Sequence, residues 1–268
     1  MTAVSPLRVP VLMYHEIADT AATTSRLAVS PEAFADQLAY LRDEGFTGIT
    51  AGELSAILAG GPGELPERPV VVTFDDGYGD FYSQALPLLK QHDLTSTIFM
   101  TTGWIGVDGV AKRMLTWQEL AEVAEHGIEI GAHTCKHPQL DQLREGALHE
   151  ELYASKSLLE DKLGFAVPGL AYPFGYSSGK VRQMARDLGY VYAYAVDNAL
   201  STSAADKFSI PRLTVGRTTS MDSFIAMVNG EDTMTLRKDR MMSKGFTAVR
   251  RTRSGIRVAT DAVRRPKR

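Results

Sequence analysis

Two clusters of polar residues in this chain combine side chains that bind metals with side chains that move protons. Asp75 and Asp76 follow one apolar run, and His133 and His137 follow another farther along the chain. A catalytic zinc site typically has three protein ligands and leaves one coordination position open for water. We expect Asp76, His133 and His137 to be these ligands, with Asp75 as the general base that takes a proton from the water. Together these residues are typical of a metal-assisted hydrolase.

The apolar runs before these clusters predict strands of a parallel sheet. Residues 69–74 and 128–132 are short and nearly continuous apolar runs, the pattern of a strand that is buried on both faces. Strands and helices are predicted to alternate, and repeated units of this kind predict an α/β fold whose sheet closes, or nearly closes, into a barrel. The predicted strands are residues 9–14, 46–49, 69–74, 95–102, 128–133, 169–173 and 190–196, and the predicted helices are residues 30–44, 53–59, 79–91, 116–126, 144–163 and 179–188.

Polar residues follow the carboxyl ends of four of these strands. His15, Asp75, His133 and the turn Pro173-Phe174-Gly175 all lie just beyond a predicted strand. The carboxyl ends of the strands form the face on which α/β barrels gather their catalytic residues. We therefore expect the four segments to converge on one rim and to form a single site.

The composition is that of a folded protein without a membrane-spanning run. The 268 residues, 44% hydrophobic and 23% charged, suffice for one barrel-sized domain. The first residues lack the basic stretch and long apolar core of a secretory signal, and no apolar run reaches spanning length. The single cysteine, Cys135, excludes an intrachain disulfide and fits a reducing compartment. These features predict a cytoplasmic protein, although prior removal of an export signal would leave the same sequence.

Charge is distributed unevenly along the chain. Residues 233–268 contain twelve lysines and arginines against two aspartates, although the net charge of the whole chain is −3. We expect residues 1–232 to form the catalytic barrel and residues 233–268 to form a basic tail that is partly disordered or weakly helical. A weak amphipathic pattern in the tail favours peripheral contact with an anionic membrane surface or with a partner protein. No recognition motif accompanies the charge, so nucleic acid is not favoured.

The two polar clusters also match the motifs of a known family. Thr73-Phe74-Asp75-Asp76-Gly77 and His133-Thr134-Cys135-Lys136-His137 resemble the first and second motifs of the polysaccharide deacetylases, the carbohydrate esterases with a NodB-type domain. The resemblance covers roughly residues 9–228. It implies a distorted, TIM-like (β/α) barrel that hydrolyses an acetamide or an acetyl ester, usually on a sugar. It also implies that the metal and the backbone N–H of Phe174 stabilise the oxyanion.

The later segments depart from the family pattern. Residues 171–175 read Ala-Tyr-Pro-Phe-Gly, with alanine where the family has an arginine that steadies the catalytic aspartate. Residues 210–215 lack the family's C-terminal histidine, and the fourth motif is not recognisable around residues 196–199. Tyr14-His15 after the first strand resembles the N-terminal Tyr-His of the poly-N-acetylglucosamine deacetylase subgroup. This resemblance implies that His15 is the proton donor. Arg212, near another strand end, would replace the missing arginine beside the base.

The sequence therefore predicts one divalent metal and a deacetylation reaction. Zinc is the first choice, and cobalt, nickel, manganese or iron also suit one aspartate and two histidines. The residues predicted to surround the oxyanion or the substrate are Phe174, Tyr172, Arg212 and Leu213. The expected substrate is an N-acetylated sugar, saccharide or glycoside. An O-acetyl esterase, a non-sugar amidase and a catalytically silent barrel that binds a carbohydrate or a partner protein remain as alternatives.

Overall fold

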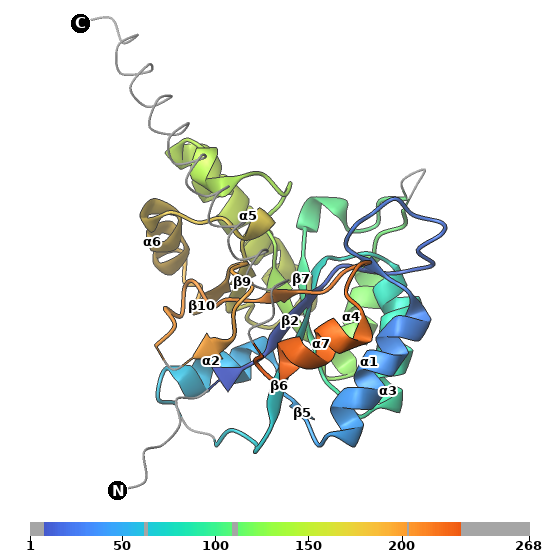
Figure 1. Cartoon of the computed structure of the whole chain (residues 1–268). Coiled ribbons are helices and arrows are strands. Elements are labelled where there is room, and N and C mark those ends of the chain that lie inside the picture. Colours follow the sequence, from blue (N-terminus) through green and yellow to red (C-terminus); the bar gives the residue numbers. More distant parts are fainter. Residues whose placement is uncertain (1–7, 62–63, 109–111, 203, 232–268) are drawn as a thin grey trace, which may run out of the picture.

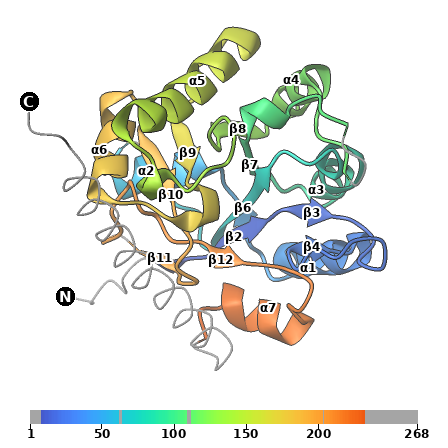
Figure 2. The same ribbon diagram turned by 90° about the horizontal axis from the view of Figure 1, so that it is seen from above.

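The computed structural model of the chain describes residues 8–61, 64–108, 112–202 and 204–231. A curled sheet of parallel strands forms a half-barrel at its centre, which Figures 1 and 2 show from two directions. The strands of this sheet are β2 (Val11–Tyr14), β5 (Thr47–Gly48), β6 (Pro69–Asp76), β7 (Thr97–Met100), β8 (Glu129–Ala132), β9 (Gly169–Ala171), β10 (Tyr192–Tyr194) and β12 (Leu213–Thr214). They follow the order β10-β9-β8-β7-β6-β2-β12, and β5 pairs with the start of β6.

Helices cover the outer side of the sheet, and one helix lies at its amino end (Figure 2). The α-helices are α1 (Pro31–Asp43), α2 (Ala51–Leu58), α3 (Leu86–Gln91), α4 (Trp117–Glu125), α5 (Glu145–Leu163), α6 (Gly179–Asp187) and α7 (Met221–Val228). Local signals fix several of their ends. Ser30 caps α1, and capping boxes that begin at Thr50 and Thr116 start α2 and α4.

Two apolar cores follow from the alternation of side chains along the strands. The larger core lies between the sheet and the outer helices. The smaller core fills the inside of the half-barrel, where Val11, Val71, Phe99 and Tyr194 pack together with Leu54 of α2. The amino end of the barrel is therefore plugged by α2, and the carboxyl end is left for polar side chains.

A short segment near the end of the barrel joins its two edges. Ile210 pairs with Tyr194 of β10, and Leu213 pairs with Leu12 of β2. Only Pro211 and Arg212 separate these two positions along the chain. The chain therefore crosses from one edge strand to the other within a few residues, and Arg212 is held inside the barrel during this crossing.

The predicted α/β barrel and its alternation of strands and helices are confirmed, with differences at the ends of elements. The predicted strand 95–102 forms a ladder only over β7, because a 3-10 turn (Thr102–Trp104) follows it. The predicted helix 79–91 begins with a π-helical turn (Phe81–Ala85). The predicted strand 9–14 is divided at Pro10 into β1 (Arg8–Val9) and β2. The sequence did not predict α7, the pairing of β1 with β11 (Ser201–Thr202), or the short pair of β3 (Glu16–Ile17) with β4 (Ala28–Val29).

The structure does not test the predictions for the basic tail and for the location of the protein. The basic tail, residues 233–268, lies outside the described residues. Among the helices of the described part, none combines the length and the apolar character needed to cross a membrane. The cytoplasmic location stays a prediction.

Candidate active site

The two aspartates lie at the carboxyl end of β6 and reach one cavity in different ways. Alternation along the strand places Thr73 and Asp75 on the inner side of the sheet, while Phe74 packs against the outer helices. By this alternation Asp76 would point outward with Phe74. Its φ of 75°, in the left-handed region, turns the chain instead, so Asp76 lines the same cavity as Asp75.

A buried guanidinium holds Asp75 in position. Arg212 is fully buried, and its Nη1 and Nη2 atoms donate hydrogen bonds to Asp75 Oδ1 at 2.6 Å and to Oδ2 at 2.7 Å. Nη1 also donates to the Thr73 hydroxyl, and Nε donates to the Ala195 carbonyl. Paired, charge-assisted hydrogen bonds of this kind fix both the position and the orientation of a carboxylate. Ala171, at the position of the family's arginine, has no charge to contribute.

This pairing keeps Asp75 ionised in spite of its burial. Burial alone would raise the pKa of the Asp75 carboxyl, but the adjacent Arg212 and the more distant His133 hold this pKa well below its usual range. Asp75 is therefore a carboxylate at neutral pH. A carboxylate in this state can accept a proton from a group in the cavity.

The two histidines come from β8 and from the loop that follows it. His133 Nδ1 lies 2.8 Å from the Ala171 carbonyl, and because a carbonyl only accepts hydrogen bonds, Nδ1 carries the proton. The other ring nitrogen, Nε2, then has a free lone pair and faces Asp76 Oδ1 at 3.6 Å. His137 Nε2 lies 3.4 Å from the same oxygen. One ligand atom from each of the three residues thus lies within 4.8 Å of the others.

These separations suit a divalent metal better than hydrogen bonds. Ligands about 2.0–2.2 Å from a tetrahedral zinc ion lie about 3.3–3.6 Å from one another, which matches the two distances to Asp76 Oδ1. Asp76 Oδ1 is buried and has no hydrogen-bond partner among the described residues. An unpaired buried carboxylate oxygen is costly unless a cation binds it. Asp76, His133 and His137 therefore fit a metal ion both in geometry and in donor type.

Burial sets the protonation of these three groups in a way that suits metal binding. It lowers the pKa of His133 to about 3 and also lowers the pKa of His137, so both rings are neutral at physiological pH. Burial raises the pKa of Asp76 to about 6, and the nearby Asp75 charge adds to this rise. The cavity thus disfavours net charge on its own ligands and favours a cation that would compensate Asp76.

His15 lines the same cavity as the two histidines. It follows β2 directly, and its buried Nδ1 has no hydrogen-bond partner within the described residues. Burial lowers the pKa of His15, opposed by the charges of Asp75 and Asp76. The structure therefore brings the predicted proton donor to the predicted base and ligands.

The turn after β9 contributes Phe174 and Gly175 to the wall of the cavity. Phe174 has a left-handed φ of 60°, and its ring is 51% exposed and packs 4.6 Å from the His137 ring, centre to centre. No hydrogen bond uses the Phe174 backbone N–H within the described part of the chain. Gly175, with a φ of 73°, is needed here because a Cβ would lie 2.5 Å from the Val196 Cβ. The N–H of Phe174 is thus available to an oxygen atom in the cavity.

The site occupies a cavity of about 490 Å³ with a partly aromatic wall. It is lined by Met13, His15, Glu16, Ser25, Leu27, Asp75, Asp76, Tyr78, Trp104, His133, His137, Phe174, Gly175, Tyr176, Val196 and Thr214. Tyr172 and Leu213, predicted beside the substrate, do not line it. Both are buried, and the Tyr172 hydroxyl donates to the Phe208 carbonyl. Arg212 does not line the cavity either, and it contacts the lining residue Asp75 from inside the barrel.

Comparisons with known proteins agree with this geometry. A sequence profile described as polysaccharide deacetylase matches residues 63–193. The Bacillus subtilis protein YxkH, assigned by its name to the polysaccharide deacetylases, is 30% identical over 223 residues, which cover 83% of this chain and 77% of that protein. The chain belongs to the polysaccharide deacetylase family.

Other members of the polysaccharide deacetylase family are also similar in sequence or structure. The poly-β-1,6-N-acetyl-D-glucosamine N-deacetylase of Escherichia coli K12 is 23% identical over 81% of this chain, which spans only 38% of that protein. The deacetylase PplD of Streptococcus pyogenes, solved with acetate, matches with a TM-score of 0.76 and 28% identity over 85% of this chain and 100% of that one. IcaB of Ammonifex degensii matches with a TM-score of 0.69 and 26% identity over 84% of this chain and 97% of that one.

One ion pair beside the cavity was not predicted from the sequence. Glu16 is almost fully buried, and its Oε1 accepts a hydrogen bond from Lys112 Nζ at 2.5 Å. The same Nζ lies 4.7 Å from the centre of the Tyr78 ring. Glu16 directly follows His15, so its place at a strand end could have marked it. Lys112 gave no such signal, because 96 positions separate it from Glu16.

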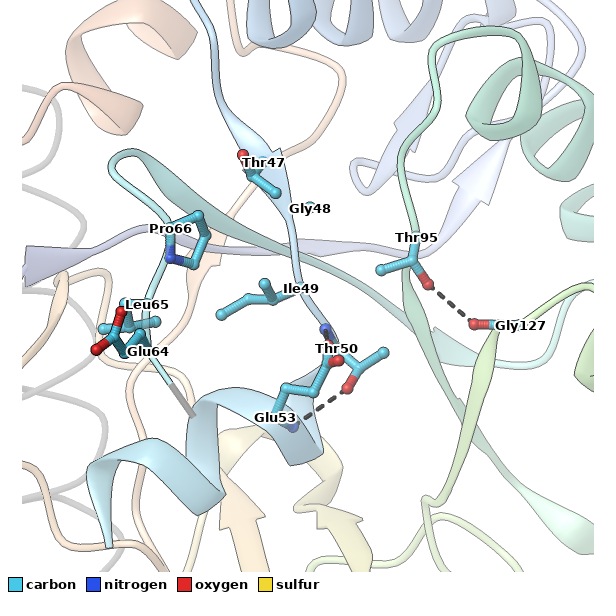
Figure 3. Close-up of a pocket in the computed structure, with 10 residues that line it drawn as sticks. All are labelled: Thr47, Gly48, Ile49, Thr50, Glu53, Glu64, Leu65, Pro66, Thr95 and Gly127. Atoms are coloured by element: carbon cyan, nitrogen blue, oxygen red, sulfur yellow. Dashed lines mark hydrogen bonds between the residues drawn. The ribbon is translucent and has the colours of Figure 1, made fainter. Parts of the chain in front are cut away.

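A second hollow of about 700 Å³ lies at the opposite end of the sheet, where residues of β5, of the start of α2 and of the turns before β7 and β8 line it (Figure 3). Its two carboxylates are Glu53 and Glu64, and no histidine lines it. Glu53 is committed to the capping box of α2, where it accepts a hydrogen bond from the Thr50 backbone N–H. This hollow therefore lacks the combination of aspartates and histidines that the chemistry requires, although it is the larger of the two.

Proposed function

We propose that this protein is a metal-dependent deacetylase that removes the acetyl group from an N-acetylated sugar or saccharide. The observation that carries the proposal is the arrangement of two neighbouring aspartates in one cavity. Asp75 is held ionised by Arg212, while Asp76 keeps an unpaired oxygen beside His133 and His137. Base and ligand are thus separated by their surroundings, although they are adjacent in sequence.

The proposed metal ligands are Asp76, His133 and His137. A divalent ion bound there would polarise the acyl oxygen and make a water molecule more acidic. Zinc suits two imidazole nitrogens and one carboxylate oxygen, and cobalt, nickel, manganese and iron accept the same donors. The hydrogen bond from His133 Nδ1 to the Ala171 carbonyl supports this role, since it orients Nε2 toward Asp76.

The remaining roles fall to residues that line the same cavity. Asp75 takes a proton from the attacking water, and Arg212 keeps the carboxylate oriented for this step. The Phe174 N–H, which is already fixed by the turn, donates a hydrogen bond to the acyl oxygen as negative charge develops on it. His15 protonates the departing amine. The products are acetate and a free amino sugar.

The cavity wall supports a carbohydrate as substrate. Phe174 and Tyr176 stack with their ring centres 6.3 Å apart, and Trp104 lies 5.4 Å from the His137 ring. Aromatic faces next to hydrogen-bonding groups suit the mixed apolar and polar surface of a sugar ring. The Escherichia coli relative is named for an N-acetylglucosamine polymer, which makes N-acetylglucosamine the first substrate to test.

Acetate release from short β-1,6-linked N-acetylglucosamine oligomers would test this function. The zinc-loaded protein should release acetate, and protein treated with a chelator should regain activity when zinc is added. Asp75→Asn should lower kcat about 10²–10⁴-fold, the range of general-base contributions. Asp36→Asn, at an exposed position on α1, is the matched control and should leave kcat unchanged.

The outcomes separate the alternatives. Release from O-acetylated but not N-acetylated sugars would replace the proposal with an esterase, and release from non-sugar acetamides alone would replace it with an amidase. Equal silence of wild type and Asp75→Asn on all of these compounds would favour a binding protein.

A further inference from the structure

The loop that carries His137 has an unusual backbone conformation. Thr134 and His137 both have positive φ values, 68° and 56°, which residues other than glycine rarely adopt. Such a conformation costs stability and persists only when the surroundings of the residue determine it. The position of His137 therefore depends on the contacts that hold residues 134–136.

On its inner side, the loop is held by the turn after β7. The backbone N–H groups of Thr102 and Gly103 donate to the carbonyls of Thr134 and Cys135 at 3.1 and 2.8 Å. Gly103 permits this approach, because a Cβ there would lie 2.5 Å from the Cys135 carbonyl oxygen. The carbonyl groups of the loop are thus satisfied from this side.

On its outer side, the loop is held by a single carboxylate. Glu151 Oε2, from α5, accepts hydrogen bonds from the backbone N–H groups of both Cys135 and Lys136, each at 2.9 Å. Successive backbone N–H groups that point to one anion form a concave anion site, and bonds to a carboxylate are stronger than bonds between neutral groups. The long helix α5 passes close to this end of β8 (Figure 2), so the carboxylate comes from a rigid element.

The two histidines differ in how they are oriented. His133 is fixed by its strand and by the hydrogen bond from its own ring to the Ala171 carbonyl. The His137 ring instead packs between Trp104 and Phe174, with ring centres 5.4 and 4.6 Å away. Its direction toward Asp76 is therefore set mainly by the backbone of the loop.

We propose that Glu151 is a positioning residue for the metal ligand His137. Its carboxylate offsets the strain of the loop and holds His137 Nε2 toward Asp76 Oδ1, which completes the three-ligand set. This inference rests on the metal-dependent function proposed above. It assigns a role in the metal site to a residue of α5 that does not line the cavity and that accepts hydrogen bonds from residues between the two histidines.

The test compares metal affinity and ligand geometry among variants of Glu151. Glu151→Ala should weaken zinc binding, measured by competition with a chelating dye, about 10–100-fold, the usual effect of removing a partner of a ligand. With cobalt in place of zinc, its visible absorption spectrum should change shape or intensity as His137 leaves its position. Glu151→Gln keeps an oxygen acceptor and should retain affinity within about tenfold of wild type.

Glu150→Ala is the matched control, because it removes an exposed carboxylate from the adjacent position of the same helix. It should leave both affinity and spectrum unchanged. If Glu151→Ala does not fold, Glu151→Asp keeps the charge but withdraws the oxygen by one methylene, and it should also lose affinity.

Three results would overturn the inference: unchanged affinity and spectrum in Glu151→Ala or Glu151→Asp, equal loss in Glu150→Ala, or loss in Glu151→Gln as large as in Glu151→Ala. Failure of wild type to bind zinc or cobalt at all would instead reject the metal-dependent function itself.

Discussion

The two ends of the half-barrel differ in how their ionisable side chains are paired, and β8 shows both ends. Glu129 and His133 lie four residues apart on the inner side of the same strand, at its start and just past its end. At the amino end, Glu129 accepts hydrogen bonds from the Gly52 N–H, the Thr97 hydroxyl and the Tyr192 hydroxyl. At the carboxyl end, Asp76 Oδ1 and His15 Nδ1 are buried without a partner among the described residues.

Backbone strain is concentrated at the carboxyl end, although Asp93, in the turn before β7, also has a left-handed φ. Asp76, Thr134, His137 and Phe174 all have left-handed φ values at the carboxyl end. The amino end is instead closed by α2, which begins with a capping box and donates the Gly52 N–H to the carboxylate of Glu129. Backbone strain and unpaired ionisable groups cost stability, and they persist where they serve binding or catalysis. The difference therefore indicates that the amino end serves stability and the carboxyl end serves chemistry.

Arg212 is the residue whose loss should affect both stability and chemistry most. Arg212→Ala would leave the buried Asp75 charge unpaired, which should lower the free energy of unfolding by about 3–5 kcal/mol. In the folded fraction, the pKa of Asp75 should rise, so the acidic limb of the pH–rate profile should move to higher pH. Chemical denaturation and the pH dependence of kcat/KM measure the two effects.

Arg212→Lys is the milder companion variant, since lysine keeps the charge but not the paired geometry. It should shift the acidic limb less than Arg212→Ala. A pH–rate profile identical to that of wild type in both variants would show that Arg212 does not act on the base.

Glu129 tests whether the amino end is purely structural. Glu129→Ala would leave the Thr97 and Tyr192 hydroxyls and one backbone N–H without their acceptor, which should cost about 2–4 kcal/mol of stability. Thermal unfolding should show this loss, while kcat of the folded enzyme at a lower temperature stays within about twofold of wild type. A large fall in kcat without a fall in stability would contradict the division between the two ends.

Substitution of Asp80, in the turn beyond β6, should raise the stability of the protein instead of lowering it. Burial raises its pKa to about 7, and its Oδ1 is buried without a partner among the described residues. Folding therefore favours protonated Asp80, and this contribution is complete below pH 4 and is lost as the pH rises toward 7. Asp80→Asn should be more stable than wild type by about 1–2 kcal/mol at pH 8, with no gain at pH 4. Urea denaturation at both pH values measures this difference. No gain in stability at pH 8, or an equal gain at both pH values, would contradict the expectation.

Phe174 should show the smallest effect. Phe174→Ala removes the exposed ring but keeps the backbone N–H, so KM should rise about 3–10-fold while kcat changes little. Val191→Ala, which trims another exposed apolar side chain near the amino end of β10, should change neither constant. A fall in kcat as large as that of Asp75→Asn would mean that the ring itself shapes the reacting geometry.

Sequence alone determined the parts of the site that are local along the chain. Short apolar runs predicted β6 and β8, and the residues that follow them supplied Asp75, Asp76, His133 and His137. Strand direction then placed these residues on one rim, because parallel strands share their carboxyl ends. Motif order was sufficient for the family, which the comparisons confirmed.

Tertiary structure decided what depends on contacts between distant segments. The place of Arg212 beside Asp75 was predicted from its position near a strand end, but its paired hydrogen bonds across 137 positions depend on the path of the last segment. Lys112 meets Glu16 across 96 positions, and the sequence did not predict this pair. The hydrogen bonds between Glu151 and the histidine loop depend on how α5 packs beside β8. Periodicity and motif spacing report neighbours along the chain, whereas these pairs are set by loop paths and helix packing that no local pattern encodes.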